Sequence, residues 1–118
     1  MRLPSQFLLA FALSSFALVS TGCANEARKS RGATAKEMVA AGAVLLDVRS
    51  PGEFNRGHLP NALNIPINEL GRRAGEIPAA SKVVIYCESG VRSRQGVSIL
   101  KKKGHEVFDL GSWRDWGP

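Results

Sequence analysis

Two short apolar runs constrain the fold of this chain more than any other feature. Residues 43–48 read AVLLDV, with a single acidic side chain, and residues 83–86 read VVIY. Runs rich in branched side chains, without alternating polar residues, are typical of strands that are covered on both faces. Such strands need helices on each side of their sheet, so the two runs predict an α/β domain.

Helix signals alternate with these runs along the chain. Capping-box patterns occur at Thr34 and at Ser50, each with a glutamate three residues later, and Gly42 and Gly104 are suited to ending helices. The alternation predicts a mostly parallel central sheet of four to five strands with helices on both faces. Residues 28–33 are compatible with the fifth strand. The remaining expected elements are helices over residues 68–74 and 93–103 and strands over residues 62–65 and 106–110.

The N-terminal residues have the pattern of an export signal. A basic start is followed by an uncharged apolar block over residues 7–19 and by the small residues of 20–22. The block is short for a membrane span, so residues 1–22 are interpreted as a signal peptide. Cys23 then occupies the place of the lipidated cysteine of a bacterial lipoprotein. Cleavage by the ordinary signal peptidase after Ala24 is the alternative.

This interpretation divides the chain into three parts. Residues 1–22 are the signal peptide, the polar residues 23–32 are a tether, and residues 33–118 form one domain. The predicted location is the periplasm or cell envelope, with a lipid anchor at Cys23 in a bacterial membrane. The formal charge of +6 comes from scattered basic residues, and the lysines at 101–103 suit a helix end. No nucleic-acid partner is therefore expected.

Cys87 stands at the end of a predicted buried strand, directly before a predicted helix. In parallel sheets, ligands bind beyond the carboxyl ends of the strands. Backbone N–H groups of residues 88–92, the positive end of the following helix and the charge of Arg92 all favour a thiolate at this position. Gly90 allows a tight loop. Cys87 is therefore predicted to be a nucleophile, and the alternative is a buried structural cysteine.

Four segments in the same order resemble a single-domain rhodanese, a sulfurtransferase, over about residues 33–118. They are CESGVRS at 87–93, DVR at 47–49 with EF at 53–54, GHLPNALNIP at 57–66, and LGSW at 110–113 with a later Trp116. The resemblance is to the small periplasmic rhodaneses. It implies that a sulfane sulfur passes from thiosulfate or a related donor to a thiophilic acceptor through a Cys87 persulfide.

The resemblance also implies the site residues and partners. Cys87 is the catalytic residue, and residues 88–92 bind the substrate or persulfide: Glu88, Ser89, Gly90, Val91 and Arg92. Asp47 and Arg49 are expected to organise the loop as an ion pair or a hydrogen-bond pair, without a catalytic role. Neither a metal nor an organic cofactor is needed, the partners are a small sulfur donor and a thiol or cyanide acceptor, and a monomer is expected.

Two other functions remain as alternatives. Phosphatases and arsenate reductases of the same fold use a seven-residue loop, whereas the six residues from Cys87 to Arg92 favour sulfur transfer. A non-catalytic rhodanese-like binding module often lacks the cysteine. Outside the loop, His58 is expected to cap or pack its own loop, and Trp113 and Trp116 are expected to close the core. The Glu88 carboxylate is expected to repel an anionic donor such as thiosulfate.

Overall fold

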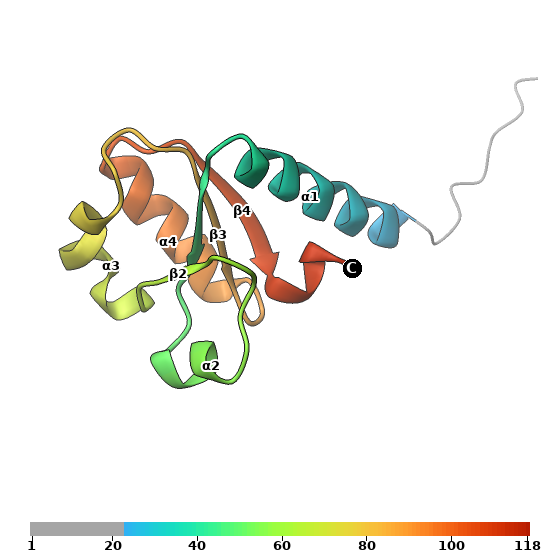
Figure 1. Cartoon of the computed structure of the whole chain (residues 1–118), viewed down its shortest axis with the longest axis horizontal. Helices are drawn as coiled ribbons and strands as arrows, with labels where there is room; N and C mark the ends of the chain where they lie inside the picture. Colours follow the sequence, from blue (N-terminus) through green and yellow to red (C-terminus); the bar gives the residue numbers. More distant parts are fainter. Residues whose placement is uncertain (1–22) are drawn as a thin grey trace, which may run out of the picture.

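The computed structural model describes residues 23–118, so the predicted signal peptide at 1–22 lies outside the described residues. Helices and strands alternate through the described part of the chain (Figure 1). In chain order the elements are α1 (Cys23–Ala40), β1 (Val44–Asp47), α2 (Pro51–Asn55), β2 (Leu63–Asn64), α3 (Ile67–Arg73), the short 3-10 helix η1 (Ala74–Glu76), β3 (Val83–Cys87), α4 (Val91–Lys102), β4 (Val107–Ser112) and the 3-10 helix η2 (Trp113–Trp116).

The four strands of residues 23–118 form one parallel sheet in the order β2–β1–β3–β4. The predicted α/β fold with a mostly parallel central sheet is therefore confirmed. The prediction of a possible fifth strand within residues 28–33 is wrong, because these residues belong to α1. The two apolar runs became β1 and β3, which lie side by side at the centre of the sheet.

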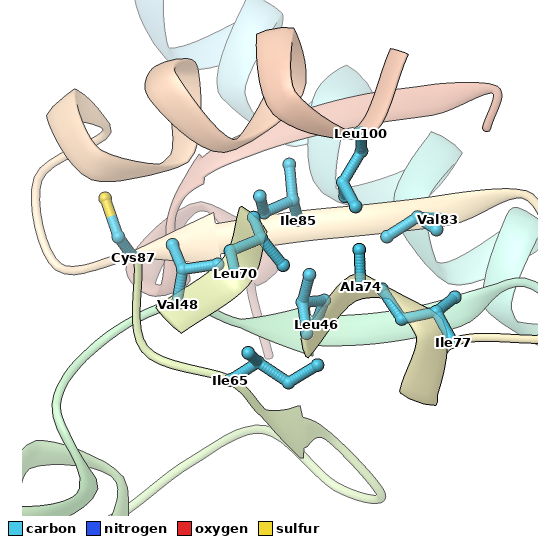
Figure 2. Packing of buried hydrophobic residues seen from close by; sticks show 10 residues of the cluster. All are labelled: Leu46, Val48, Ile65, Leu70, Ala74, Ile77, Val83, Ile85, Cys87 and Leu100. Carbon is cyan, nitrogen blue, oxygen red and sulfur yellow. The ribbon is translucent and has the colours of Figure 1, made fainter. Parts of the chain in front are cut away.

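Alternate residues of β3 face two different cores, one on each side of the sheet. Val83, Ile85 and Cys87 pack in the core that contains Leu70 of α3 and Leu100 of α4 (Figure 2). Val84 and Tyr86 pack in the core that Ala35 of α1 and the two tryptophans of η2 cover. Side chains alternate along a strand, so Cys87 lies on the α4 side of the sheet while Tyr86 lies on the α1 side.

The first helix begins earlier than the sequence pattern predicts. The capping box expected at Thr34 is wrong, because α1 runs without a break from Cys23 to Ala40 and Thr34 Oγ1 donates to the Ser30 carbonyl within it, at 2.9 Å. Residues 23–32, predicted to be a polar tether, form the first part of this helix. Alanine, arginine, lysine and glutamate dominate this stretch and favour a helix. None of the helices within residues 23–118 is long and apolar enough to cross a membrane.

The second capping box is confirmed. Ser50 Oγ accepts a hydrogen bond from the Glu53 N–H at 3.2 Å, and Glu53 Oε1 accepts one from the Ser50 N–H at the same distance. The short helix α2 therefore begins as predicted, with Pro51 in its first turn.

Gly32 lets α1 approach the C-terminal segment closely. A Cβ at this position would lie 2.3 Å from the Asp115 carbonyl oxygen and 2.8 Å from that of Trp116. Both atoms belong to the backbone, which a side-chain rotation cannot move. The packing of α1 on η2 therefore depends on the missing side chain.

Gly32→Ala is expected to lower the free energy of unfolding by about 1–3 kcal/mol, because the two segments must separate to fit the methyl group. Gly71→Ala is the matched control, since Gly71 lies in α3 and a Cβ there would meet nothing within 4 Å. That variant is expected to gain about 0.5–1 kcal/mol from better helix propensity. Urea denaturation compares the two, and an equal gain in both would show that α1 does not pack on η2 this closely.

Candidate functional site

The Cys87 sulfur lies at the start of α4. Its Sγ atom accepts hydrogen bonds from the N–H of Gly90 at 2.9 Å and from the N–H of Ser93 at 3.4 Å. The sulfur points toward the first turn of the helix (Figure 2). The first N–H groups of a helix lack partners within the helix, and they carry the positive end of its dipole. This position is suited to holding negative charge on sulfur.

The loop reaches this geometry through Gly90. Its φ angle of 97° lies in the left-handed region, which glycine adopts without a steric cost. Ser93 Oγ donates to the Gly90 carbonyl at 3.1 Å and so holds the turn. Ser89 and Val91 are exposed, while Cys87 itself is fully buried, at 0% exposure.

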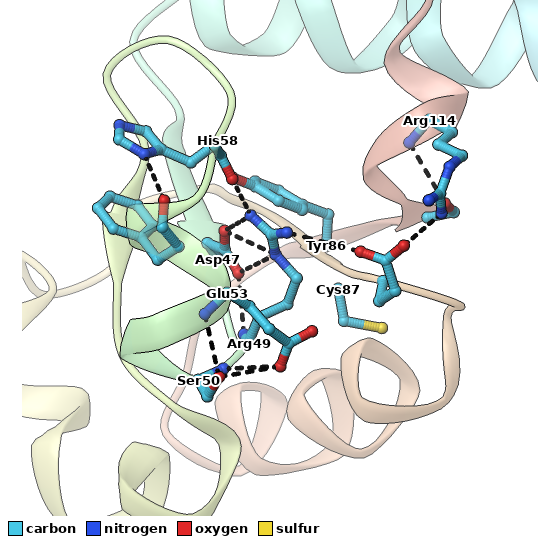
Figure 3. A network of polar contacts seen from close by, with 12 residues as sticks. Asp47, Arg49, Ser50, Glu53, His58, Tyr86, Cys87 and Arg114 are labelled. Atoms are coloured by element: carbon cyan, nitrogen blue, oxygen red, sulfur yellow. Dashed lines mark hydrogen bonds and ion pairs between the residues drawn. The ribbon is translucent and has the colours of Figure 1, made fainter.

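Asp47 and Arg49 form the predicted ion pair beside the loop. Arg49 Nη2 lies 2.7 Å from Asp47 Oδ2, and Arg49 Nε donates to the same carboxylate (Figure 3). Both side chains are buried, at 2% and 0% exposure for Arg49 and Asp47. Arg49 also donates to the Gly57 carbonyl at 2.7 Å, and its guanidinium lies 4.8 Å from the centre of the Trp113 ring. The pair thus connects the end of β1 to the loop after α2 and to η2.

Arg92 makes a paired contact that the sequence pattern did not predict. The sequence predicts a positive charge of Arg92 near the loop, and in the structure its guanidinium donates two hydrogen bonds to Glu53, at 2.7 and 3.0 Å. The hydrogen bonds from Arg92 lower the pKa of Glu53 to about 2. The arginine therefore joins α4 to α2, and most of its charge is matched by the carboxylate.

The Glu88 carboxylate, which is expected to repel an anionic donor, is paired with two arginines. Its two oxygens face different arginines: Oε2 lies 3.5 Å from Arg49 Nη1, and Oε1 forms an ion pair with Arg114 Nη1 (Figure 3). Arg114 belongs to η2, 26 residues further along the chain. Two cations therefore hold the carboxylate of the residue that directly follows Cys87.

A cavity of about 290 Å³ opens beside this carboxylate. Both signs of charge face it, and one aromatic ring forms a wall. The lining residues are Arg49, Glu53, Arg56, Gly57, Glu88 and Trp113. Trp113 packs in the α1-side core as predicted, and it also lines the cavity. Its indole nitrogen is buried without a hydrogen-bond partner among residues 23–118.

His58 has the packing role that the sequence predicts. Its ring stacks on Phe54 with the centroids 3.7 Å apart, and its Nδ1 lies 2.9 Å from the Phe54 carbonyl oxygen. Within residues 23–118, no group of three or more histidine, cysteine or acidic side chains is arranged to hold a metal ion.

A family model for the rhodanese-like domain matches residues 32–117. The chain belongs to this family. Its members among solved structures share the fold: a rhodanese-related protein from Thermoplasma volcanium is 31% identical with a TM-score of 0.64, covering 72% of this chain and 85% of that one. A structure described as rhodanese with anions, from Escherichia coli, is 32% identical with a TM-score of 0.58, covering 63% and 91%.

Curated relatives of this rhodanese-like domain include proteins named for sulfur transfer. A sulfurtransferase of Allochromatium vinosum is 42% identical over 62 residues, covering 52% of this chain and 58% of the relative. Thiosulfate sulfurtransferase PspE of Escherichia coli is 34% identical over 73 residues, covering 59% and 70%. A further relative, which is described as the uncharacterized protein YqhL of Bacillus subtilis, is 42% identical over 77 residues, covering 64% and 61%. The chain thus matches about three fifths of the length of the first and third of these relatives.

The sequence pattern did not identify three residues of the rhodanese-like domain's site: Ser93, Arg56 and Arg114. The Ser93 N–H donates to the Cys87 sulfur from one residue beyond the predicted binding residues 88–92. The predicted helix start at this position could have indicated it, because the first N–H groups of a helix lack partners within the helix. Arg56 and Arg114 carried no such signal. Arg56 directly follows α2 and lines the same cavity as Glu88, whereas Arg114 lies on η2 and pairs with Glu88. Only the fold brings these two arginines to the site.

Proposed function

We propose that this rhodanese-like domain is a sulfurtransferase that carries a sulfane sulfur as a persulfide on Cys87. The observation that supports this most is the pair of backbone N–H groups, from Gly90 and Ser93, directed at the Cys87 sulfur. A cysteine that only fills a core needs no donors directed at its sulfur. Donors at a helix start stabilise negative charge on a thiolate or on the outer sulfur of a persulfide.

The proposed reaction is a double displacement. The Cys87 thiolate attacks the outer sulfur of thiosulfate, the bond between the two thiosulfate sulfurs breaks, and sulfite leaves with the electron pair. Cyanide or the thiolate of a small or protein thiol then attacks the outer persulfide sulfur. The persulfide bond breaks, and its electron pair returns to the Cys87 thiolate. No metal or organic cofactor takes part.

Each residue near the sulfur has a proposed role in this cycle. The loop residues 88–92 surround the persulfide, with Gly90 donating directly, and the Asp47–Arg49 pair holds the end of β1 against the loop. Cys87 is fully buried, and the loop residues Ser89 and Val91 are exposed. The domain acts as a monomer in this proposal.

Intact-mass measurement after incubation with thiosulfate tests the proposal. The purified protein is expected to gain the mass of one sulfur atom, to lose it when cyanide is added, and to release thiocyanate. Hydrolysis of a phosphate ester such as para-nitrophenyl phosphate, without the mass gain, would instead indicate phosphatase chemistry. If the protein shows neither sulfur transfer nor phosphatase activity, Cys87 is a core residue of a binding module.

For the location, we propose that a lipid on Cys23 anchors the domain to the cell envelope. Cys23 is exposed at the first residue of α1, and the preceding residues have the export pattern described above. In a bacterial host, the wild type is expected in the detergent phase after phase partitioning. Cys23→Ser is expected to leave that phase or to remain unprocessed, and a wild-type N-terminus at Asn25 without acyl chains would show ordinary secretion instead.

A further inference from the structure

The Glu88 carboxylate is held by a residue that no motif of the active-site loop contains. Arg114 lies on η2 and pairs with one carboxylate oxygen, while the buried Arg49 faces the other at 3.5 Å. Arg49 already binds Asp47 with two nitrogens, so its charge is largely matched by that carboxylate. Arg114 is therefore the main cation that offsets the charge of Glu88.

This charge matters because the carboxylate lines the cavity beside the loop. Glu88 directly follows Cys87 in the chain, and its side chain is 34% exposed. An anionic sulfur donor that approaches Cys87 meets this carboxylate, and an unmatched charge of the same sign would weaken its binding. A cation paired with the carboxylate reduces that repulsion and keeps the side chain in one place.

Contacts made by the residues just before and just after η2 hold the segment that carries Arg114. Its backbone N–H donates to Ser112 Oγ at 3.2 Å, and Lys36 Nζ of α1 donates to the Pro118 carbonyl at 2.6 Å. Gly32 of α1 allows the close approach to the backbone of Asp115 and Trp116. The helix α1 thus fixes the segment from which Arg114 reaches Glu88.

We propose that Arg114 is a specificity-determining residue, which acts through Glu88 and allows the site to accept an anionic sulfur donor. The inference rests on the proposed sulfur transfer from an anionic donor of the thiosulfate class. Arg114 is a positioning residue: it holds and neutralises the carboxylate, and it does not touch the reacting sulfur.

Steady-state kinetics of the purified protein with thiosulfate test this role. Arg114→Gln is expected to raise KM for thiosulfate roughly two- to five-fold, the effect of losing one partly exposed ion pair, with kcat unchanged. The rate of Cys87 modification by methyl methanethiosulfonate, a neutral reagent, is expected to stay within two-fold. Comparing the change in KM for thiosulfate with the change in the modification rate isolates the effect of the donor's charge. The increase in KM is expected to shrink at high salt.

The double variant separates action through Glu88 from direct attraction of the donor. In a Glu88→Gln background, Arg114 has lost its partner and its exposed side chain extends into solvent, so Arg114→Gln is expected to change KM less than two-fold. The same increase in both backgrounds would show that Arg114 attracts the donor directly, and it would overturn the proposal. An unchanged KM in the single variant would overturn it as well.

Arg72→Gln is the matched control, because Arg72 is also exposed and pairs with a glutamate, Glu69, but on α3. Its KM is expected to equal that of the wild type. A wild type that transfers no sulfur at all would refute the proposed function. A wild type that transfers sulfur, beside an Arg114→Gln variant with the same KM, would refute only the role of Arg114.

Discussion

Cys87→Ser is expected to abolish sulfur transfer, lowering thiocyanate formation from thiosulfate and cyanide to the level of the uncatalysed reaction. A serine hydroxyl cannot form a persulfide, and it stays protonated under the conditions in which a thiolate attacks. The variant is also expected to show no gain of a sulfur atom by intact mass. Thiocyanate formation and mass are measured on the same preparation.

The fold itself supplies the control for this prediction. Cys23 is the other of the two cysteines of the chain and is exposed at the start of α1. The purified Cys23→Ser variant is therefore expected to keep both the activity and the mass gain. Circular dichroism checks that Cys87→Ser is folded, because Cys87 packs in a core. Activity of Cys87→Ser close to that of the wild type would remove Cys87 from the mechanism.

Asp47→Ala is expected to lower the free energy of unfolding by about 3–5 kcal/mol, since it leaves a buried guanidinium without its closest counter-charge. Asp47 and Arg49 are both almost completely buried, and three side-chain hydrogen bonds join them. The free energy is measured by urea denaturation. The contacts of Arg49 with Glu88 and with the Gly57 carbonyl remain in the variant and place the loss toward the lower end of this range.

An exposed ion pair supplies the comparison. Glu76 pairs with Arg73 at 2.6 Å, but its side chain is 48% exposed, so Glu76→Ala is expected to cost less than about 1 kcal/mol. A loss of similar size in the two variants would contradict the buried character of the Asp47–Arg49 pair.

Several features of the site follow from local sequence patterns. The end of β3 at Cys87 and the start of α4 can be predicted because an apolar run and a helix pattern meet there, with Gly90 between them. The capping box at Ser50 is equally local, since both of its partners lie within four residues. The Asp47–Arg49 contact joins residues two apart on one strand end.

Other features depend on segments that are distant in the chain. Arg92 meets Glu53 across 39 residues, and Arg114 meets Glu88 across 26, so neither pairing leaves a spacing that a sequence pattern could reveal. The sequence therefore predicts the charges of Arg92 and Glu88 beside the loop but not the partner that each has in the folded chain. The close packing of α1 on η2 is a further case, because Gly32 approaches the backbone of Asp115 and Trp116, which are distant in the chain.

The sequence by itself determined the fold class, the order of most elements and the place of Cys87 between a buried strand and a helix, because hydrophobic pattern and turn residues act over a few positions. The tertiary structure alone decided which charges meet across distant segments of the chain. Packing of η2 against α1 brings Arg114 to Glu88, and packing of α2 beside α4 brings Glu53 to Arg92. Charged side chains on distant segments leave no periodic signal, so these pairs form only when the backbone is folded.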